Sequence, residues 1–75
     1  MKEQIISIIR DIKNDQTIAE DAHLVFDGVL NSLEILQLIT ELEQHYSVKI
    51  PVEEVLPDNF DTIDGIEKMI VHLLA

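Results

Sequence analysis

Ser32 and its neighbours form the segment of this 75-residue chain that is best suited to chemistry. Asn31 is a favoured N-cap residue and Glu34 follows it at capping-box spacing, so a helix is predicted to begin at Ser32. Backbone N–H groups in the first turn of a helix have no intrahelical partners, and the helix dipole is positive there. These groups would stabilise a phosphate ester on the Ser32 hydroxyl, so covalent attachment of a phosphate-containing group is one interpretation. The other is that Ser32 only helps to cap the helix.

Leu33 adds a second unusual feature to the same helix start. The apolar residues of the predicted helix fall on one stripe, which comprises Ile35, Leu38, Ile39, Leu42 and Tyr46. At about 100° per residue, Leu33 lies almost opposite this stripe. Single exposed apolar residues are common on protein surfaces, which would explain Leu33 if it stood alone. Its position beside a serine at the positive end of a helix weakens that explanation.

Elsewhere in the chain, the residue pattern gives only weak signals of a metal site or a catalytic site. There is no cysteine, so a disulfide and a thiolate metal site are excluded, and any thiol would have to be added. None of the three histidines (His23, His45 and His72) has a partner at the spacing of a compact metal motif, and we expect no metal site. Acids such as Glu41 and Glu43 could act in acid–base chemistry, but so short a chain has little room for an enclosed pocket. We therefore expect that the protein is not an enzyme.

The charge of the chain restricts its partners. Its 15 acidic and 5 basic residues give a formal net charge of −10. Nucleic acids and anionic membrane surfaces are polyanions, so we expect neither as a partner. Membrane insertion is not expected either, since no apolar run approaches the roughly 18 residues of a membrane span. A protein partner with a basic surface fits the acidic excess, which lies in residues 15–75 and not in residues 2–14.

The pattern of apolar residues predicts an all-α fold in a single domain, residues 1–75. The three main helices are expected at residues 2–14, at residues 32–46, and from Asp61 or Thr62 to Leu74. The first helix is rich in β-branched isoleucine, which also suits a strand. The spacing of its isoleucines by three and four residues favours a helix.

The connections complete a small four-helix bundle. One short helical turn is expected at residues 52–56, stopped by Pro57 and followed by a loop at residues 58–61 that holds Phe60. A long loop at residues 15–31 joins the first two main helices. It carries turn residues together with apolar residues, so we expect it to pack on the bundle by its own side chains.

Three segments of the chain resemble one known family. Residues 27–35, Asp-Gly-Val-Leu-Asn-Ser-Leu-Glu-Ile, are similar to the phosphopantetheine attachment motif of acyl and peptidyl carrier proteins. Residues 46–51 resemble the stretch after the second helix in these proteins, and residues 57–63 resemble the approach to their last helix. The resemblance covers about residues 2–74. It departs from the family pattern at Asn31, where these proteins usually have Asp.

The resemblance implies a carrier protein that is modified on Ser32. A phosphopantetheinyl transferase would attach 4′-phosphopantetheine from coenzyme A to this serine, and the thiol of that arm would hold an acyl or aminoacyl group as a thioester. In the family, the carboxylate at the position of Asn31 helps to present the serine to the transferase, so Asn31 bears on the rate of modification or on the choice of transferase. The chain would act as a cytoplasmic monomer in a specialised pathway of polyketide, nonribosomal peptide, D-alanyl or modified fatty acid chemistry.

The resemblance also implies a docking surface around Ser32. Expected partners are the phosphopantetheinyl transferase, an acyl- or aminoacyl-loading enzyme, and a downstream transferase or synthase with basic docking surfaces. The residues that match the docking positions of the family are Leu33, Glu34, Leu36, Gln37, Thr40, Glu41, Glu43, Val52, Glu53 and Glu54. The alternative is a helical protein–protein interaction module that keeps the carrier fold and has lost the arm, and Asn31 is the feature that favours it.

Overall fold

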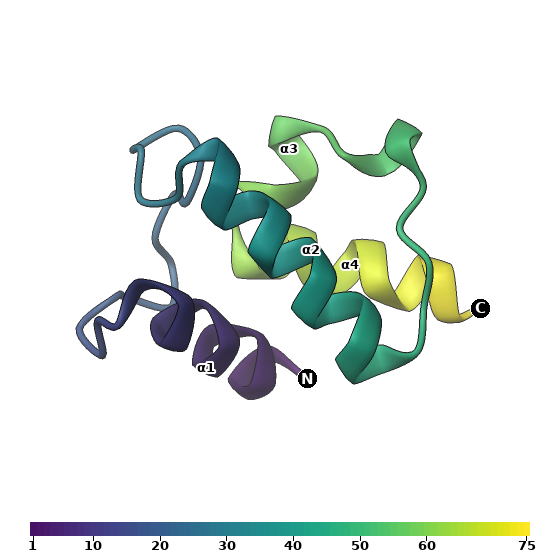
Figure 1. Ribbon diagram of the computed structural model, residues 1–75, viewed down its shortest axis with the longest axis horizontal. Helices are drawn as coiled ribbons and strands as arrows, with labels where there is room; N and C mark the ends of the chain where they lie inside the picture. Colours follow the sequence, from purple (N-terminus) through teal and green to yellow (C-terminus); the bar gives the residue numbers. More distant parts are fainter.

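The computed structural model describes all 75 residues and contains helices, turns and loops but no strand. The main helices are α1 (Lys2–Lys13), α2 (Ser32–Tyr46) and α4 (Ile63–Leu74), and the short helix α3 (Pro57–Phe60) precedes α4 (Figure 1). A single 3₁₀ turn, Val52–Glu54, lies between α2 and α3. The predicted all-α bundle with a long loop between its first two helices is confirmed. None of the helices is long and apolar enough to cross a membrane.

The isoleucines of α1 explain where this helix packs. Ile5, Ile6 and Ile9 are buried, at a spacing that places them on one face, and α1 contacts both α2 and α4. The helix ends at Asn14, which adopts the left-handed conformation (φ 50°) and donates its backbone N–H to carbonyl oxygens of the last turn. Burial of one helical face therefore prevails over the β-propensity of isoleucine.

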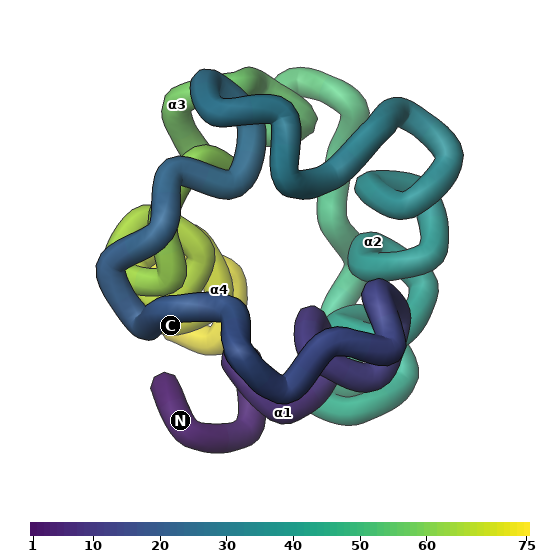
Figure 2. Tube along the Cα trace, turned by 90° about the vertical axis from the view of Figure 1, so that its left-hand side faces the viewer, coloured from purple at the N-terminus to yellow at the C-terminus, as the bar shows by residue number.

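The loop between α1 and α2 is held in place by its own side chains. Ile18, Leu24 and Leu30 are buried in the same apolar cluster as the helices. The Arg10 guanidinium donates two hydrogen bonds, of 2.7 and 3.1 Å, to the carbonyl oxygen of Ile18. Figure 2 shows the loop passing the start of α4 and then α3 before it reaches α2. The loop thus covers one end of the bundle, and its predicted packing is confirmed.

The segment before α4 differs from the prediction. Pro57 begins α3 instead of stopping a helix, because a proline at the first helical position sacrifices no hydrogen bond and already has a suitable φ. Phe60 is the last residue of α3 and is 1% exposed, so it belongs to the core and not to a loop. The turn that precedes α3 covers residues 52–54, which is shorter than the predicted 52–56.

The start of α4 distinguishes between the two predicted caps. Thr62 is the N-cap, and its hydroxyl accepts a hydrogen bond from the Gly65 N–H at 3.0 Å. Asp61 is buried, and its carboxylate accepts hydrogen bonds from the loop between α1 and α2. Gly65 suits the close packing here, since a Cβ would lie 3.2 Å from the carbonyl oxygen of Asp58.

Candidate functional site

The start of α2 is closed by a complete capping box, as its sequence predicts. Asn31 is in the extended region (φ −87°, ψ 177°), and its side-chain oxygen accepts a hydrogen bond from the Glu34 N–H at 2.8 Å. The Glu34 carboxylate in turn accepts a hydrogen bond from the Asn31 N–H at 2.9 Å. Ser32 is the first residue of the helix and is exposed. Because Asn31 and Glu34 make the cap, the Ser32 hydroxyl is not needed for it and remains available for chemistry.

Lys13, the last residue of α1, binds the capping-box residue Glu34 at the start of α2. Its ammonium lies 2.9 Å from one carboxylate oxygen of Glu34 and 3.2 Å from the other. The hydrogen bond from Asn31, followed by the contact with Lys13, lowers the pKa of Glu34 below its ordinary value. The Glu34 side chain is only 18% exposed, and the carboxylate of this predicted docking residue already has bonding partners within the protein. Sequence reasoning missed Lys13, because the two residues are 21 positions apart in the chain.

The predicted docking residues divide into an exposed group and an internally bonded group. Those that are exposed are Leu33, Leu36, Gln37, Thr40, Glu41, Val52 and Glu53. Glu43 is half-buried, and its carboxylate accepts a hydrogen bond from the Ile50 N–H at 2.8 Å. Glu54 is also half-buried and accepts a hydrogen bond from the Asn59 side chain at 3.1 Å. Together with Glu34, three of the five acids in the predicted set therefore have partners within the chain.

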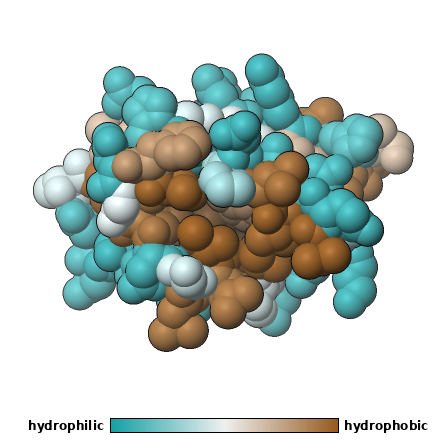
Figure 3. All heavy atoms as spheres, turned by 90° about the horizontal axis from the view of Figure 1, so that it is seen from above, coloured by the Kyte–Doolittle hydropathy of each residue, from teal (hydrophilic) through white to brown (hydrophobic).

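An apolar hollow of about 340 Å³ lies beside Ser32. Its walls come from the α1–α2 loop, from α2, and from the segment that leads into and through α3. The residues that line it are Val25, Ser32, Ile35, Leu36, Ile39, Val55, Leu56, Pro57 and Phe60. Figure 3, viewed from above Figure 1, shows hydrophobic side chains gathered on this face of the molecule. The sequence did not reveal this hollow, because its walls come from separate segments that only the fold brings together.

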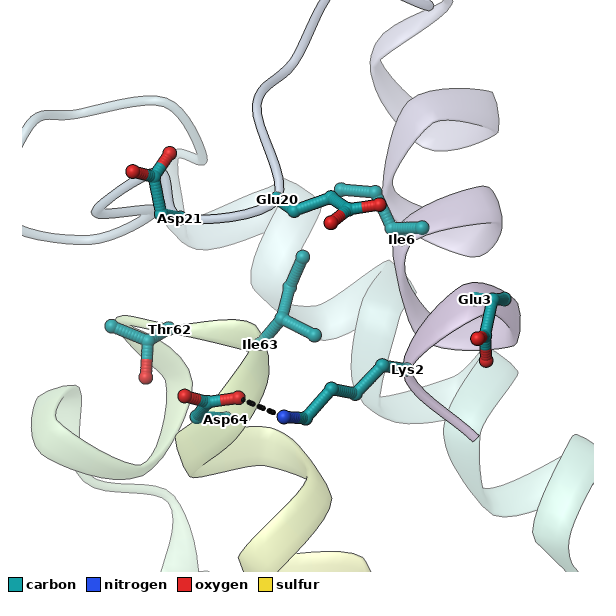
Figure 4. Close-up of a pocket in the computed structure, with 8 residues that line it drawn as sticks. All are labelled: Lys2, Glu3, Ile6, Glu20, Asp21, Thr62, Ile63 and Asp64. Carbon is teal, nitrogen blue, oxygen red and sulfur yellow. Dashed lines mark ion pairs between the residues drawn. The ribbon is translucent and has the colours of Figure 1, made fainter.

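A second hollow of similar volume lies between the start of α1, the α1–α2 loop and the start of α4 (Figure 4). Its polar lining includes Glu3, Glu20 and Asp21, and it contains none of the predicted site residues. The Lys2 ammonium lies 2.6 Å from a carboxylate oxygen of Asp64, and this ion pair is largely exposed. No group of three or more histidine, aspartate or glutamate side chains in the structure is arranged to hold a metal ion.

Comparison of the sequence with known proteins shows the family of the chain. The family model described as the phosphopantetheine attachment site matches residues 3–70. The chain belongs to this carrier family. Among its curated relatives, the D-alanyl carrier protein of Streptococcus suis is 32% identical over 99% of this chain and 95% of its own length. The aminoacyl carrier protein 2 of Bradyrhizobium diazoefficiens is 25% identical over 100% of this chain and 88% of its own length.

A third curated relative is also named as a D-alanyl carrier protein. The D-alanyl carrier protein of Lactococcus lactis subsp. cremoris is 34% identical over 88% of this chain and 86% of its own length. The matched family model describes an attachment site for phosphopantetheine, and the names of these relatives describe carriers of D-alanyl and aminoacyl groups.

The residues at the start of α2 fit the prosthetic group of this carrier family, 4′-phosphopantetheine. The family joins this group to a serine through a phosphate ester, and Ser32 presents an exposed hydroxyl in the first turn of α2. Unpaired first-turn N–H groups and the positive end of the helix dipole favour a phosphate at this position. A group attached to Ser32 would have the apolar hollow beside it.

Proposed function

We propose that this protein carries an acyl or aminoacyl group as a thioester on a 4′-phosphopantetheine arm attached to Ser32. The observation that carries the proposal is an exposed serine at the first position of a helix whose cap is made by other residues, within a chain of the carrier family. When bound, the arm supplies a thiol, which a chain without cysteine lacks. The Ser32 oxygen provides the point of attachment, and the first-turn N–H groups of α2 stabilise the phosphate.

The proposed cargo is an amino acid. The names of the relatives support this proposal. A D-alanyl carrier protein is 32% identical and an aminoacyl carrier protein is 25% identical, each over nearly the whole chain. Asn31, Gln37 and Thr40 are neutral and exposed residues near Ser32, and the resemblance stated above implies that some carriers have acids at these positions, which favours a specialised cargo. An adenylating enzyme would then load the thiol, and a transferase would consume the thioester.

The proposed partners dock on the surface around Ser32. They are a phosphopantetheinyl transferase, a loading enzyme and a downstream transferase or synthase, each of which must approach Ser32 to act on it or on its arm. Leu33 and Leu36 are 68% and 60% exposed and provide the apolar part of this surface. Glu41 and Glu53 are exposed acids that can pair with basic residues at its periphery. We place the carrier in the cytoplasm, where coenzyme A is available, as a monomer.

Modification of Ser32 is tested by intact mass after incubation with coenzyme A and a promiscuous phosphopantetheinyl transferase. We expect wild-type protein to gain the mass of one phosphopantetheine group, and Ser32→Ala to gain none. Ser7→Ala is the matched control, because Ser7 is an exposed serine of α1, and it should be modified like wild type. A wild-type protein that stays unmodified, or an S32A variant that still gains the mass, would refute the proposal.

The cargo is tested on the modified protein by loading with adenylating enzymes and ATP. We expect transfer of an amino acid to the thiol, and release of that amino acid by hydroxylamine, which cleaves thioesters. Loading by a malonyl transferase and by none of the adenylating enzymes would overturn the aminoacyl assignment while leaving the carrier role in place.

A further inference from the structure

Asp61 is the only polar or charged residue among the buried residues of this protein. Its side chain is 7% exposed and lies at the junction of α3 and α4. One carboxylate oxygen accepts hydrogen bonds from the backbone N–H groups of Val25 at 3.1 Å and Phe26 at 2.9 Å. The other lies 2.6 Å from Nδ1 of His23. A buried carboxylate with three partners on one short segment acts as a fixed anchor for that segment.

The backbone of Asp61 adds a fourth contact to the same segment. Its carbonyl oxygen accepts a hydrogen bond from the Leu24 N–H at 2.6 Å. The Leu24 carbonyl oxygen in turn accepts one from the Leu30 N–H at 2.9 Å, and Leu30 directly precedes the cap residue Asn31. Residues 23–26 are therefore anchored at residue 61, and the anchor is connected through Leu30 to the start of α2.

The anchored segment also forms part of the apolar hollow beside Ser32. Val25 lines this hollow from the loop side, and Phe60, which directly precedes Asp61, lines it from α3. Movement of residues 23–26 away from Asp61 would remove Val25 from the wall. The anchor thus holds one wall of the hollow next to Ser32 in place.

We propose that Asp61 is a positioning residue for the Ser32 site, which it serves by anchoring residues 23–26, and that His23 makes this anchor sensitive to pH. The role of the anchor in holding the loop is independent of any modification. Its effect on chemistry at Ser32 rests on the proposed function.

The acidic groups around His23 determine in which direction its contact with Asp61 changes with pH. The hydrogen bond with Asp61, and then the charge of Asp61, raise the pKa of His23 above its ordinary value, and the charges of Asp27 and Asp21 act in the same sense. Below this raised pKa, His23 is positively charged and its contact with Asp61 is charge-assisted. As the pH rises through the pKa, His23 loses its charge and the contact weakens. The two backbone hydrogen bonds to Asp61 remain, so the anchor loosens and does not vanish.

The anchor is tested first by NMR on the unmodified protein. In wild type, we expect His23 to titrate above pH 6.5, and the amide of Phe26, corrected for intrinsic exchange, to lose protection as His23 becomes neutral. In His23→Gln we expect protection to be about threefold lower at pH 6 and no longer to depend on pH across this range. His45→Gln is the matched control, because His45 is an exposed histidine of α2, and it should behave like wild type. Equal, pH-independent protection of Phe26 in wild type and H23Q would overturn the proposal.

A second variant tests the carboxylate itself. Asp61→Asn keeps the size of the side chain but removes its charge, and we expect the Val25 and Phe26 amides to lose more protection than in H23Q, with the His23 pKa returning toward 6.5. If D61N does not fold, H23Q still decides the pH-sensitive part, and Asp61→Glu tests whether the carboxylate needs its observed position. Wild-type protection of the Val25 and Phe26 amides in D61N would show that the charge of Asp61 does not hold this segment and would overturn the proposal.

The connection to Ser32 is tested by the rate at which the promiscuous phosphopantetheinyl transferase modifies each variant. The rate for H23Q is divided by the rate for H45Q at each pH, which removes the pH dependence of the transferase itself. We expect the ratio to lie below one at pH 6 and to approach one at pH 8.5. A ratio that is the same at both values would refute the coupling to Ser32. Failure of wild type to be modified at all would refute the proposed function, and the NMR result would still decide the anchor.

Discussion

The ammonium of Lys13 lies 2.9 and 3.2 Å from the two carboxylate oxygens of Glu34, so the end of α1 is bonded to the capping box of α2. The same carboxylate accepts the Asn31 N–H, and Asn31 directly precedes Ser32. One side chain from a different helix therefore supports the start of α2. Glu34 is consequently part of the support for Ser32 and not a free acid of the docking surface.

Removing the ammonium of Lys13 should weaken this helix start. We expect Lys13→Met to lower the Tm by a few degrees, because the partly buried Glu34 carboxylate loses its cationic partner. Lys13→Arg should retain most of the stability, since a guanidinium can also bond both carboxylate oxygens. Thermal unfolding followed by circular dichroism measures both. A K13M variant as stable as wild type would show that the contact contributes nothing to the fold.

Asn31 can be changed in two ways that separate capping from charge. Asn31→Ala removes the cap, and we expect it to lower the free energy of unfolding by about 1 kcal/mol. Asn31→Asp keeps the cap, because both side chains accept the Glu34 N–H equally well, so its stability should stay near that of wild type. Chemical denaturation measures these values.

The charge introduced by Asn31→Asp should act on modification. The carrier proteins that this sequence resembles usually have Asp at this position, and there the carboxylate helps to present the serine to the transferase. We therefore expect N31D to raise kcat/KM for modification of Ser32 severalfold over wild type. An unchanged or lower kcat/KM in N31D would mean that a negative charge at position 31 does not promote modification of Ser32.

Leu33 should matter for partner recognition and not for stability. It is 68% exposed, so Leu33→Ala should change the free energy of unfolding by less than about 0.5 kcal/mol. We expect the same change to raise KM for the transferase, since Leu33 is adjacent to Ser32. Val71→Ala is the matched control, because Val71 is 53% exposed on α4, and it should leave both quantities unchanged. Equal KM values for the two variants would contradict a docking role for Leu33.

Acid should destabilise the protein through Asp61. Burial raises the pKa of Asp61, but the hydrogen bonds from Phe26, His23 and Val25 outweigh it and hold the pKa below its ordinary value of 3.8. A carboxyl group with a lowered pKa in the folded state contributes stability above 3.8, and this contribution is lost as the pH falls through the folded value. We therefore expect the Tm to fall below about pH 4, and to fall less steeply in Asp61→Asn.

A neighbouring acid provides the control for this pH profile. Asp58 is an exposed residue of α3, and Asp58→Asn should retain the acid-dependent fall of wild type. If D61N and D58N have the same profile from pH 2 to pH 6, Asp61 is not the group responsible.

Features that depend on local interactions could be predicted from the residue pattern. The capping box at Asn31 and Glu34 and the amphipathic faces of α1, α2 and α4 all depend on residues within about one helical turn of each other. The same kind of pattern limited the cap of α4 to Asp61 or Thr62, and the structure shows that it is Thr62. Residues this close in the sequence lose little conformational entropy when they come into contact. Their types and spacing can be recognised directly in the sequence. The position of Ser32 in the first turn of α2 belongs to this class and was predicted on this basis, whereas its role as an attachment site comes from the resemblance to carrier proteins and stays a prediction.

Contacts between residues far apart in the chain could not be predicted from the residue pattern and are seen in the folded structure alone. Lys13 and Glu34 are 21 positions apart, and His23 and Asp61 are 38 positions apart, so neither pair leaves a pattern in the sequence. Pro57 is compatible with either ending or beginning a helix, and the burial of Phe60 in the core coincides with α3 forming there. Which acids are free on the surface was likewise decided by the fold. A carboxylate in a sequence is a charge, whereas in the structure Glu34, Glu43 and Asp61 are acceptors already in use.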